Sequence, residues 1–145
     1  MLTIGVECFC AASFSGLVAL LKTRARRRVK RLYHITKAGD KIEATGEMLR
    51  GKDGYAGGGI YFAESVEEAR KKAKSKGYII TADVIVGRAK VITRPEKHTW
   101  TQLKKRGFDS VEIRGLRTGT EYVVYNRDQV TNICIEKEDS FCLVM

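Results

Sequence analysis

Gly57-Gly58-Gly59-Ile60-Tyr61-Phe62-Ala63-Glu64 is a run of three glycines that leads into a short β-branched and aromatic segment. Ser65-Val66-Glu67-Glu68 follows at once and has the spacing of a helix capping box. Glycine lacks a Cβ atom, so a backbone or a ligand can approach it closely. The stretch therefore predicts a tight turn, a strand that carries Tyr61 and a helix behind it. Two interpretations of the turn are open: a loop that lines a ligand site, or a hairpin turn beside ordinary core aromatic residues.

The composition is that of one globular domain. The chain has 145 residues, of which 43% are hydrophobic and 30% charged. Its net charge of +10 is concentrated in one place, because residues 22–31 hold seven of the 27 Lys and Arg residues and no acid. The other 20 cations face 17 acids, so the body is nearly neutral. A basic average is therefore weak evidence for a nucleic-acid-binding domain.

The cysteines and histidines show no metal-binding spacing and no disulfide framework, so we expect no metal and a reducing compartment. They are Cys8, Cys10, Cys134, Cys142, His34 and His98.

The N-terminal segment is apolar from residue 1 to 21 apart from Glu7, and the basic run comes after it. A cleavable signal peptide has the opposite order. The uninterrupted apolar part, residues 8–21, is shorter than the roughly 20 residues that cross a membrane. Two interpretations stay open: an interfacial anchor with a polybasic flank, or a helix that packs on the domain and ends in solvated basic residues.

Cys142-Leu143-Val144-Met145 matches the C-a-a-X pattern, in which a final Met favours a farnesyl group on the cysteine. One prenyl chain binds a membrane only reversibly, so a second signal is expected. The basic run, or acylation of Cys8 and Cys10, could supply it. These features predict a cytoplasmic protein associated with a membrane face.

Hydrophobic periodicity and start and stop residues define the remaining elements. Strands are expected over 32–36, 78–86, 89–92, 109–114, 120–125 and 130–136, and helices over 38–45, 65–76 and 99–106. Lysines 71, 72, 74 and 76 of the second helix are interpreted as a solvated face. About six strands that alternate irregularly with three short helices predict an α+β fold with mostly antiparallel pairing.

Three polar residues lie on predicted strands among apolar neighbours. They are His34 in Tyr-His-Ile-Thr, Tyr61 in the opening stretch, and Glu121 in Thr-Glu-Tyr-Val-Val-Tyr-Asn. A carboxylate is costly to bury without partners, so the position of Glu121 calls for an explanation. Their order and contexts resemble the His-Tyr-Glu triad of the poly(ADP-ribose) polymerase catalytic domain. Gly107-Phe108-Asp109-Ser110-Val111, and Asp128-Gln129-Val130 after residues 121–126, are similar to further blocks of that family.

The resemblance covers residues 32–135 and implies three segments: an apolar and polybasic N-terminus (1–30), an ADP-ribosyltransferase domain (31–136) and a tail (137–145). The size of this domain is close to that of small stand-alone members of the ADP-ribosyltransferase superfamily, and it leaves no room for a helical regulatory subdomain. The implied fold has two small, mostly antiparallel sheets with short helices around an NAD cleft. The implied activity is transfer of single ADP-ribose units from NAD to a protein or nucleic-acid acceptor, without a metal.

The resemblance also implies residue roles. His34 would bind the adenosine-side ribose, Tyr61 would stack on the nicotinamide ring, and Glu121 would bind the nicotinamide ribose and support developing positive charge. The backbone of Ile35 would pair with the nicotinamide amide, and the three glycines would leave room for the cofactor. Further cofactor-binding positions are Thr36, Gly59, Phe62 and Ala69.

Two departures from the family bear on function. Ile35 stands where the family usually has glycine, and residues 67–73 lack the family's serine and second stacking tyrosine. These changes keep a second hypothesis open: a catalytically silent module that binds ADP-ribose, nucleic acid or a protein partner. A third, RNA 2′-phosphotransferase chemistry on a similar fold, is less favoured, because Glu121 is acidic and the body is nearly neutral.

Overall fold

The computed structural model describes residues 28–138. The apolar N-terminal segment with Cys8 and Cys10, most of the basic run, and the Cys142 motif lie outside the described residues. Within residues 28–138 no helix is long and apolar enough to cross a membrane.

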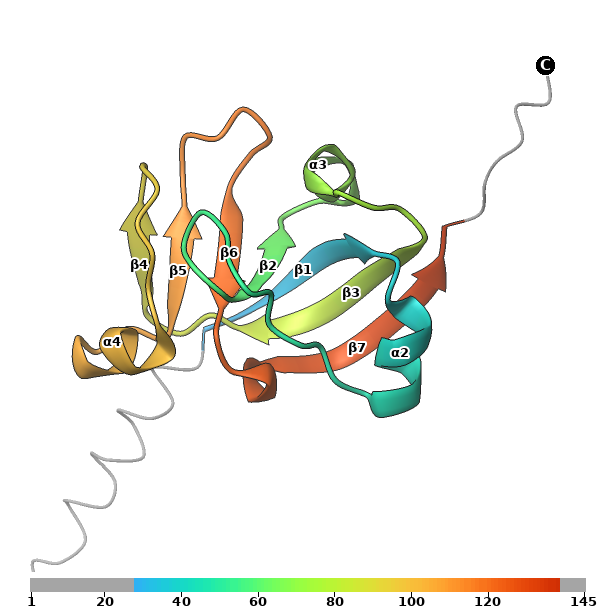
Figure 1. The fold of residues 1–145 in the computed structure, drawn as a ribbon, viewed down its shortest axis with the longest axis horizontal. Coiled ribbons are helices and arrows are strands. Elements are labelled where there is room, and N and C mark those ends of the chain that lie inside the picture. Colours follow the sequence, from blue (N-terminus) through green and yellow to red (C-terminus); the bar gives the residue numbers. More distant parts are fainter. Residues whose placement is uncertain (1–27, 139–145) are drawn as a thin grey trace, which may run out of the picture.

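Seven strands form one mixed sheet in the order β4-β5-β6-β2-β1-β3-β7 (Figure 1). The strands are β1 (Val29–Thr36), β2 (Ile60–Ala63), β3 (Tyr78–Ile85), β4 (Ala89–Ile92), β5 (Ser110–Ile113), β6 (Glu121–Val124) and β7 (Val130–Lys137). The helices are α2 (Gly39–Thr45), α3 (Val66–Lys72), α4 (Trp100–Lys105) and the 3-10 helix η1 (Arg127–Gln129). The predicted α+β class is confirmed. Pairing is mostly antiparallel, and the β4–β5 pair is parallel.

The expectation of two separate small sheets is wrong. The halves β4-β5-β6-β2 and β1-β3-β7 are joined through β1 and β2, which pair only at Tyr33 and Ala63. In contrast, β1 and β3 pair along their full length, from Val29 opposite Ile85 to Thr36 opposite Tyr78. One residue pair thus turns two half-sheets into one.

β1 begins at Val29, three residues before its predicted start, and takes in the end of the basic run. Lys30 donates to Glu64 at 2.8 Å and to the Tyr122 hydroxyl at 2.8 Å. Arg31 contacts the Asp83 carboxylate through its Nε atom at 3.0 Å. These two cations are therefore paired within the sheet.

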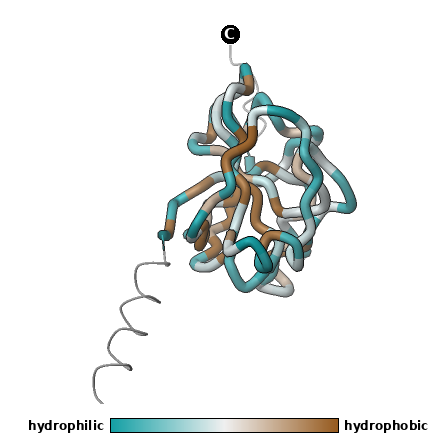
Figure 2. Tube along the Cα trace, turned by 90° about the vertical axis from the view of Figure 1, so that its left-hand side faces the viewer, coloured by the Kyte–Doolittle hydropathy of each residue, from teal (hydrophilic) through white to brown (hydrophobic). Residues whose placement is uncertain are grey.

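The predicted alternation in β3 is confirmed. Ile80, Ala82 and Val84 are fully buried, and Thr81 and Asp83 on the other face are partly exposed. Figure 2 shows the hydrophobic segments in the interior of the domain, with hydrophilic segments around them. A second group of buried residues packs between α4 and the β5–β6 half of the sheet, around Leu103 and Val123.

The helix ends test the predicted start and stop signals. Gly46 ends α2 in a left-handed conformation, and Thr99 and Gln102 form a complete capping box on α4, both as predicted. α3 ends at Lys72, where residue 76 was expected, because Ala73 adopts an extended backbone. Its cap is half formed: the Ser65 hydroxyl accepts the N–H of Glu68, whose carboxylate lies against Gly119.

The three glycines serve chain packing, so the expectation that they leave room for a cofactor is wrong for Gly57 and Gly58. A Cβ atom on Gly57, at φ +92°, would lie 2.7 Å from the carbonyl oxygen of His98. One on Gly58 would lie 2.8 Å from the carbonyl oxygen of Gly51. Gly59 lies against the Val123 side chain. The glycines therefore allow the segment before β2 to fold closely on the rest of the chain.

Gly57→Ala is expected to lower the free energy of unfolding by about 2–4 kcal/mol, because it combines backbone strain with a clash against fixed backbone atoms. The matched control is Gly46→Ala. Gly46 also has a positive φ, +68°, but a Cβ atom there would meet nothing within 4 Å. Strain alone should cost about 1–2 kcal/mol at Gly46. Urea denaturation compares the two variants, and equal losses would contradict the packing role of Gly57.

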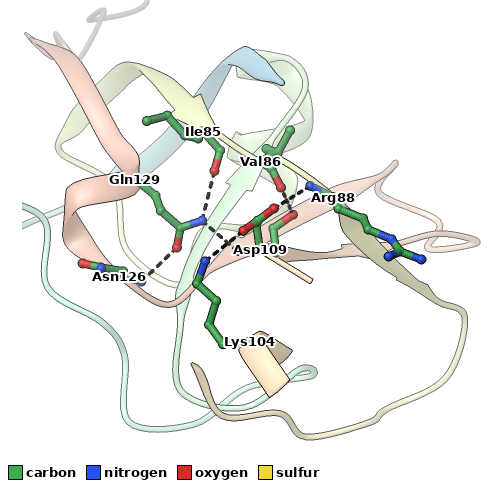
Figure 3. Close-up of polar contacts among 8 residues, drawn as sticks. Ile85, Val86, Arg88, Lys104, Asp109, Asn126 and Gln129 are labelled. Carbon is green, nitrogen blue, oxygen red and sulfur yellow. Dashed lines mark hydrogen bonds and ion pairs between the residues drawn. The ribbon is translucent and has the colours of Figure 1, made fainter. Parts of the chain in front are cut away.

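A partly buried polar network holds η1 and β5 against the turn between β3 and β4 (Figure 3). The Gln129 amide donates to the carbonyl oxygens of Ile85 at 3.0 Å and Asp109 at 2.7 Å, and accepts the Asn126 N–H at 3.1 Å. The Asp109 carboxylate accepts the Arg88 N–H at 2.9 Å. The two motif blocks around residues 109 and 129 therefore hold the fold together.

Candidate functional site

One cavity of about 900 Å³ lies between the sheet, α2, α3 and the segment that joins α2 to β2. His34, Tyr61 and Glu121 all line it, although they come from three different strands. The other predicted cofactor positions that line it are Ile35, Thr36, Gly59 and Ala69. Phe62 does not line it: its side chain is buried in the core, where it meets the His34 ring edge-on at 6.0 Å between centroids.

The three residues converge because their strands meet around Ala63. Ala63 pairs with Tyr33, the residue before His34, and also with Glu121. Tyr61 lies two residues before Ala63 on the same strand, so its side chain is on the same face of β2. The single pair that joins the half-sheets is therefore also the centre of the candidate site.

His34 is held in one tautomer. Its Nδ1 atom lies 2.7 Å from the carbonyl oxygen of Tyr61, which can only accept, so Nδ1 carries the proton. Burial lowers the pKa of the His34 imidazole, and the bond to Tyr61 only partly opposes this shift. A neutral ring protonated at Nδ1 leaves Nε2 as an acceptor, which suits a ligand hydroxyl.

We expect His34 to titrate below the usual histidine pKa of 6.5, and ¹⁵N NMR to show the Nδ1–H tautomer. Because its folded-state pKa is lower than its unfolded-state pKa, the unfolded chain binds more protons as the pH falls below 6.5. The stability that the neutral ring contributes is lost over that window. His34→Gln should flatten this part of the stability–pH curve.

The control for this measurement is His98→Gln, because burial also lowers the pKa of His98, and each variant should remove only its own part of the slope. A wild-type curve identical to that of His34→Gln would contradict the expected titration.

Tyr61 is fixed by the glycine-containing loop. Its hydroxyl donates to the Gly57 carbonyl oxygen at 2.6 Å and accepts the Ala56 N–H at 3.0 Å. Burial raises the pKa of the phenol, and the charge on Glu121 adds to that shift. With its hydroxyl tied back, Tyr61 offers the cavity a ring in a defined position and no free polar group.

Glu121 is only 16% exposed, and burial raises the pKa of its carboxyl. The Lys72 ammonium, 3.9 Å from Glu121 Oε2, acts in the opposite direction. Lys72 is 13% exposed and also donates to the Gly119 carbonyl oxygen at 3.0 Å. The expectation that Lys72 belongs to a solvated lysine face is therefore wrong.

A local signal for Lys72 was present in the sequence. Ala69 was expected at the site, and positions three and four residues further along a helix lie on the same face. Lys72 and Ala73 occupy those positions, and both line the cavity. Lys71 is exposed, as the prediction of a solvated lysine face requires.

Ile35, at the position where the poly(ADP-ribose) polymerase family usually has glycine, packs inside the domain. Its side chain is 6% exposed and packs in a small core with Ala63 and Ala69. The substitution therefore fills space between β1 and α3.

The described part of the chain contains no group of three His, Cys, Asp or Glu side chains that could hold a metal ion. The cavity instead combines a hydrogen-bond acceptor on a neutral imidazole, an aromatic wall and a buried carboxylate. Such a set suits a ligand with sugar hydroxyls and a planar ring. No protein-family model matches the chain, and no curated protein matches it significantly.

Proposed function

We propose that the protein is an NAD-dependent ADP-ribosyltransferase that adds single ADP-ribose units to a protein or nucleic-acid acceptor and releases nicotinamide. One observation carries the proposal: His34, Tyr61 and Glu121, far apart in sequence and in the order of the poly(ADP-ribose) polymerase triad, line one cavity. Its volume of about 900 Å³ lies within the usual range for ligand pockets.

In the proposed reaction the bond between nicotinamide and ribose C1″ breaks, and its electron pair leaves on the nicotinamide nitrogen. The acceptor forms a bond to C1″ and loses a proton. His34 Nε2 would accept a hydrogen bond from a hydroxyl of the adenosine ribose, and Tyr61 would stack on the pyridinium. The Glu121 carboxylate would bind the 2″-hydroxyl and stabilise the positive charge that develops on the ribose.

Incubation of the full chain with NAD carrying a label in its adenosine part tests the proposal. We expect label on protein or added nucleic acid, and free nicotinamide in equal amount by chromatography. Label without nicotinamide release would indicate that another group is transferred. If neither labelled product nor nicotinamide forms, the proposed transferase activity is wrong.

A second candidate is a module that binds ADP-ribose without catalysis. The observation in its favour is the contact between Lys72 and Glu121, because an ammonium beside the carboxylate reduces the charge that could stabilise an oxocarbenium-like ribose. Calorimetry separates the two candidates: binding of ADP-ribose without nicotinamide release from NAD would favour the silent module.

A further inference from the structure

The strongest feature that the proposed reaction does not use is the Lys72 side chain. Lys72 lines the cavity, and its ammonium lies 3.9 Å from Glu121 Oε2 and 3.0 Å from the Gly119 carbonyl oxygen. Both members of the Lys72–Glu121 pair are largely shielded, at 13% and 16% exposure, so water screens their charges less than at an open surface. The pair therefore determines the charge at this end of the cavity.

We propose that Lys72 is a specificity-determining residue: its ammonium reduces the preference for a cationic ring over a neutral one that the Glu121 carboxylate alone would give this end of the cavity. The inference rests on the proposed function, which places the nicotinamide ring on Tyr61 and the ribose attached to it on Glu121. The pyridinium of NAD⁺ carries a positive charge, and the dihydropyridine of NADH does not. A lone carboxylate would attract the pyridinium, whereas the Lys72–Glu121 pair has no net charge and attracts it less.

Other charged side chains line the cavity from α2 and the segment that joins α2 to β2: Lys41, Glu47, Arg50 and Asp53. From β1 and β2, the neutral imidazole of His34 and the neutral phenol of Tyr61 line the same cavity. From α3, the Glu68 carboxylate lies against Gly119 and does not line the cavity. Lys74 lines it from the segment after α3 and is exposed. Lys72 and Glu121 are therefore the groups whose replacement changes the local charge most.

The test compares NAD⁺ and NADH binding by calorimetry at about pH 8, well above the ordinary glutamate pKa. Lys72→Met removes the positive charge and should shift the ratio of dissociation constants about tenfold toward NAD⁺, or about 1.4 kcal/mol. Glu121→Gln leaves the ammonium alone and should shift the ratio about tenfold toward NADH. Lys72→Arg should keep the wild-type ratio, since it keeps the charge.

Lys71→Met is the matched control, because Lys71 is the exposed neighbour on α3 and does not line the cavity. Its ratio should equal that of the wild type. If Lys72 only supported the Gly119 turn, Lys72→Met would weaken both nucleotides equally and leave the ratio unchanged, which would overturn the inference while the proposed function stands. Failure of the wild type to bind either nucleotide would overturn the proposed function and the inference with it.

Discussion

Glu121→Gln is expected to lower ADP-ribose transfer by about 10²–10³-fold while the domain stays folded. Glutamine has nearly the same shape as glutamate, so the side chain still fits against the cavity wall. It has no negative charge to support the positive charge that develops on the ribose. Label transfer and nicotinamide release measure the loss, and circular dichroism checks the fold.

Glu67→Gln is the matched control for this prediction. Glu67 is an exposed carboxylate in the first turn of α3, and its replacement should leave transfer unchanged. Transfer by Glu121→Gln at the wild-type rate would remove Glu121 from the proposed machinery.

The pH dependence of transfer gives a second readout of Glu121. Because burial raises the pKa of its carboxyl, the side chain takes up a proton at a higher pH than an ordinary glutamate does. If transfer needs the carboxylate, its rate should therefore decline as the pH is lowered, and this decline should begin at a pH above the usual glutamate range. Lys72→Met should move this fall to still higher pH, since the ammonium lowers the Glu121 pKa.

Gln129→Leu is expected to lower the free energy of unfolding by about 3 kcal/mol. Gln129 is 7% exposed, and its amide satisfies the carbonyl oxygens of Ile85 and Asp109 and the N–H of Asn126. Leucine has a similar size but can satisfy none of these groups, and each buried polar group left without a partner costs about 1–3 kcal/mol. Urea denaturation monitored by tryptophan fluorescence measures the change.

Gln102→Leu provides the same chemical change at an exposed position. Gln102 completes the capping box of α4, where its side chain accepts the Thr99 N–H at 3.2 Å. Water can replace this bond, so the expected loss is about 0.5–1 kcal/mol. Similar losses in the two variants would show that the network around Gln129 contributes no more than an ordinary helix cap.

Local sequence patterns predicted the parts of this protein that depend on near neighbours. The alternation from Tyr78 to Val86 predicted β3 and its buried face, because a strand directs successive side chains to opposite sides. Gly46 and the Thr99–Gln102 pair predicted helix ends, since caps satisfy backbone groups within a few residues. The order of His34, Tyr61 and Glu121 also predicted a shared site, through a resemblance of their contexts.

Tertiary structure alone decided the features that join distant parts of the chain. The contact of Tyr33 with Ala63 unites the half-sheets, and no periodicity within either strand specifies it. Gly57 is needed because the backbone of His98, 41 positions later, lies against it. The spacing of Lys72 from Ala69 indicates its helix face, but its ammonium is shielded from solvent only because Gly119 and Glu121 meet α3 there. Side-chain type and local hydrophobic periodicity determine the helices and strands, but the surroundings of each side chain depend on which helices and strands pack together.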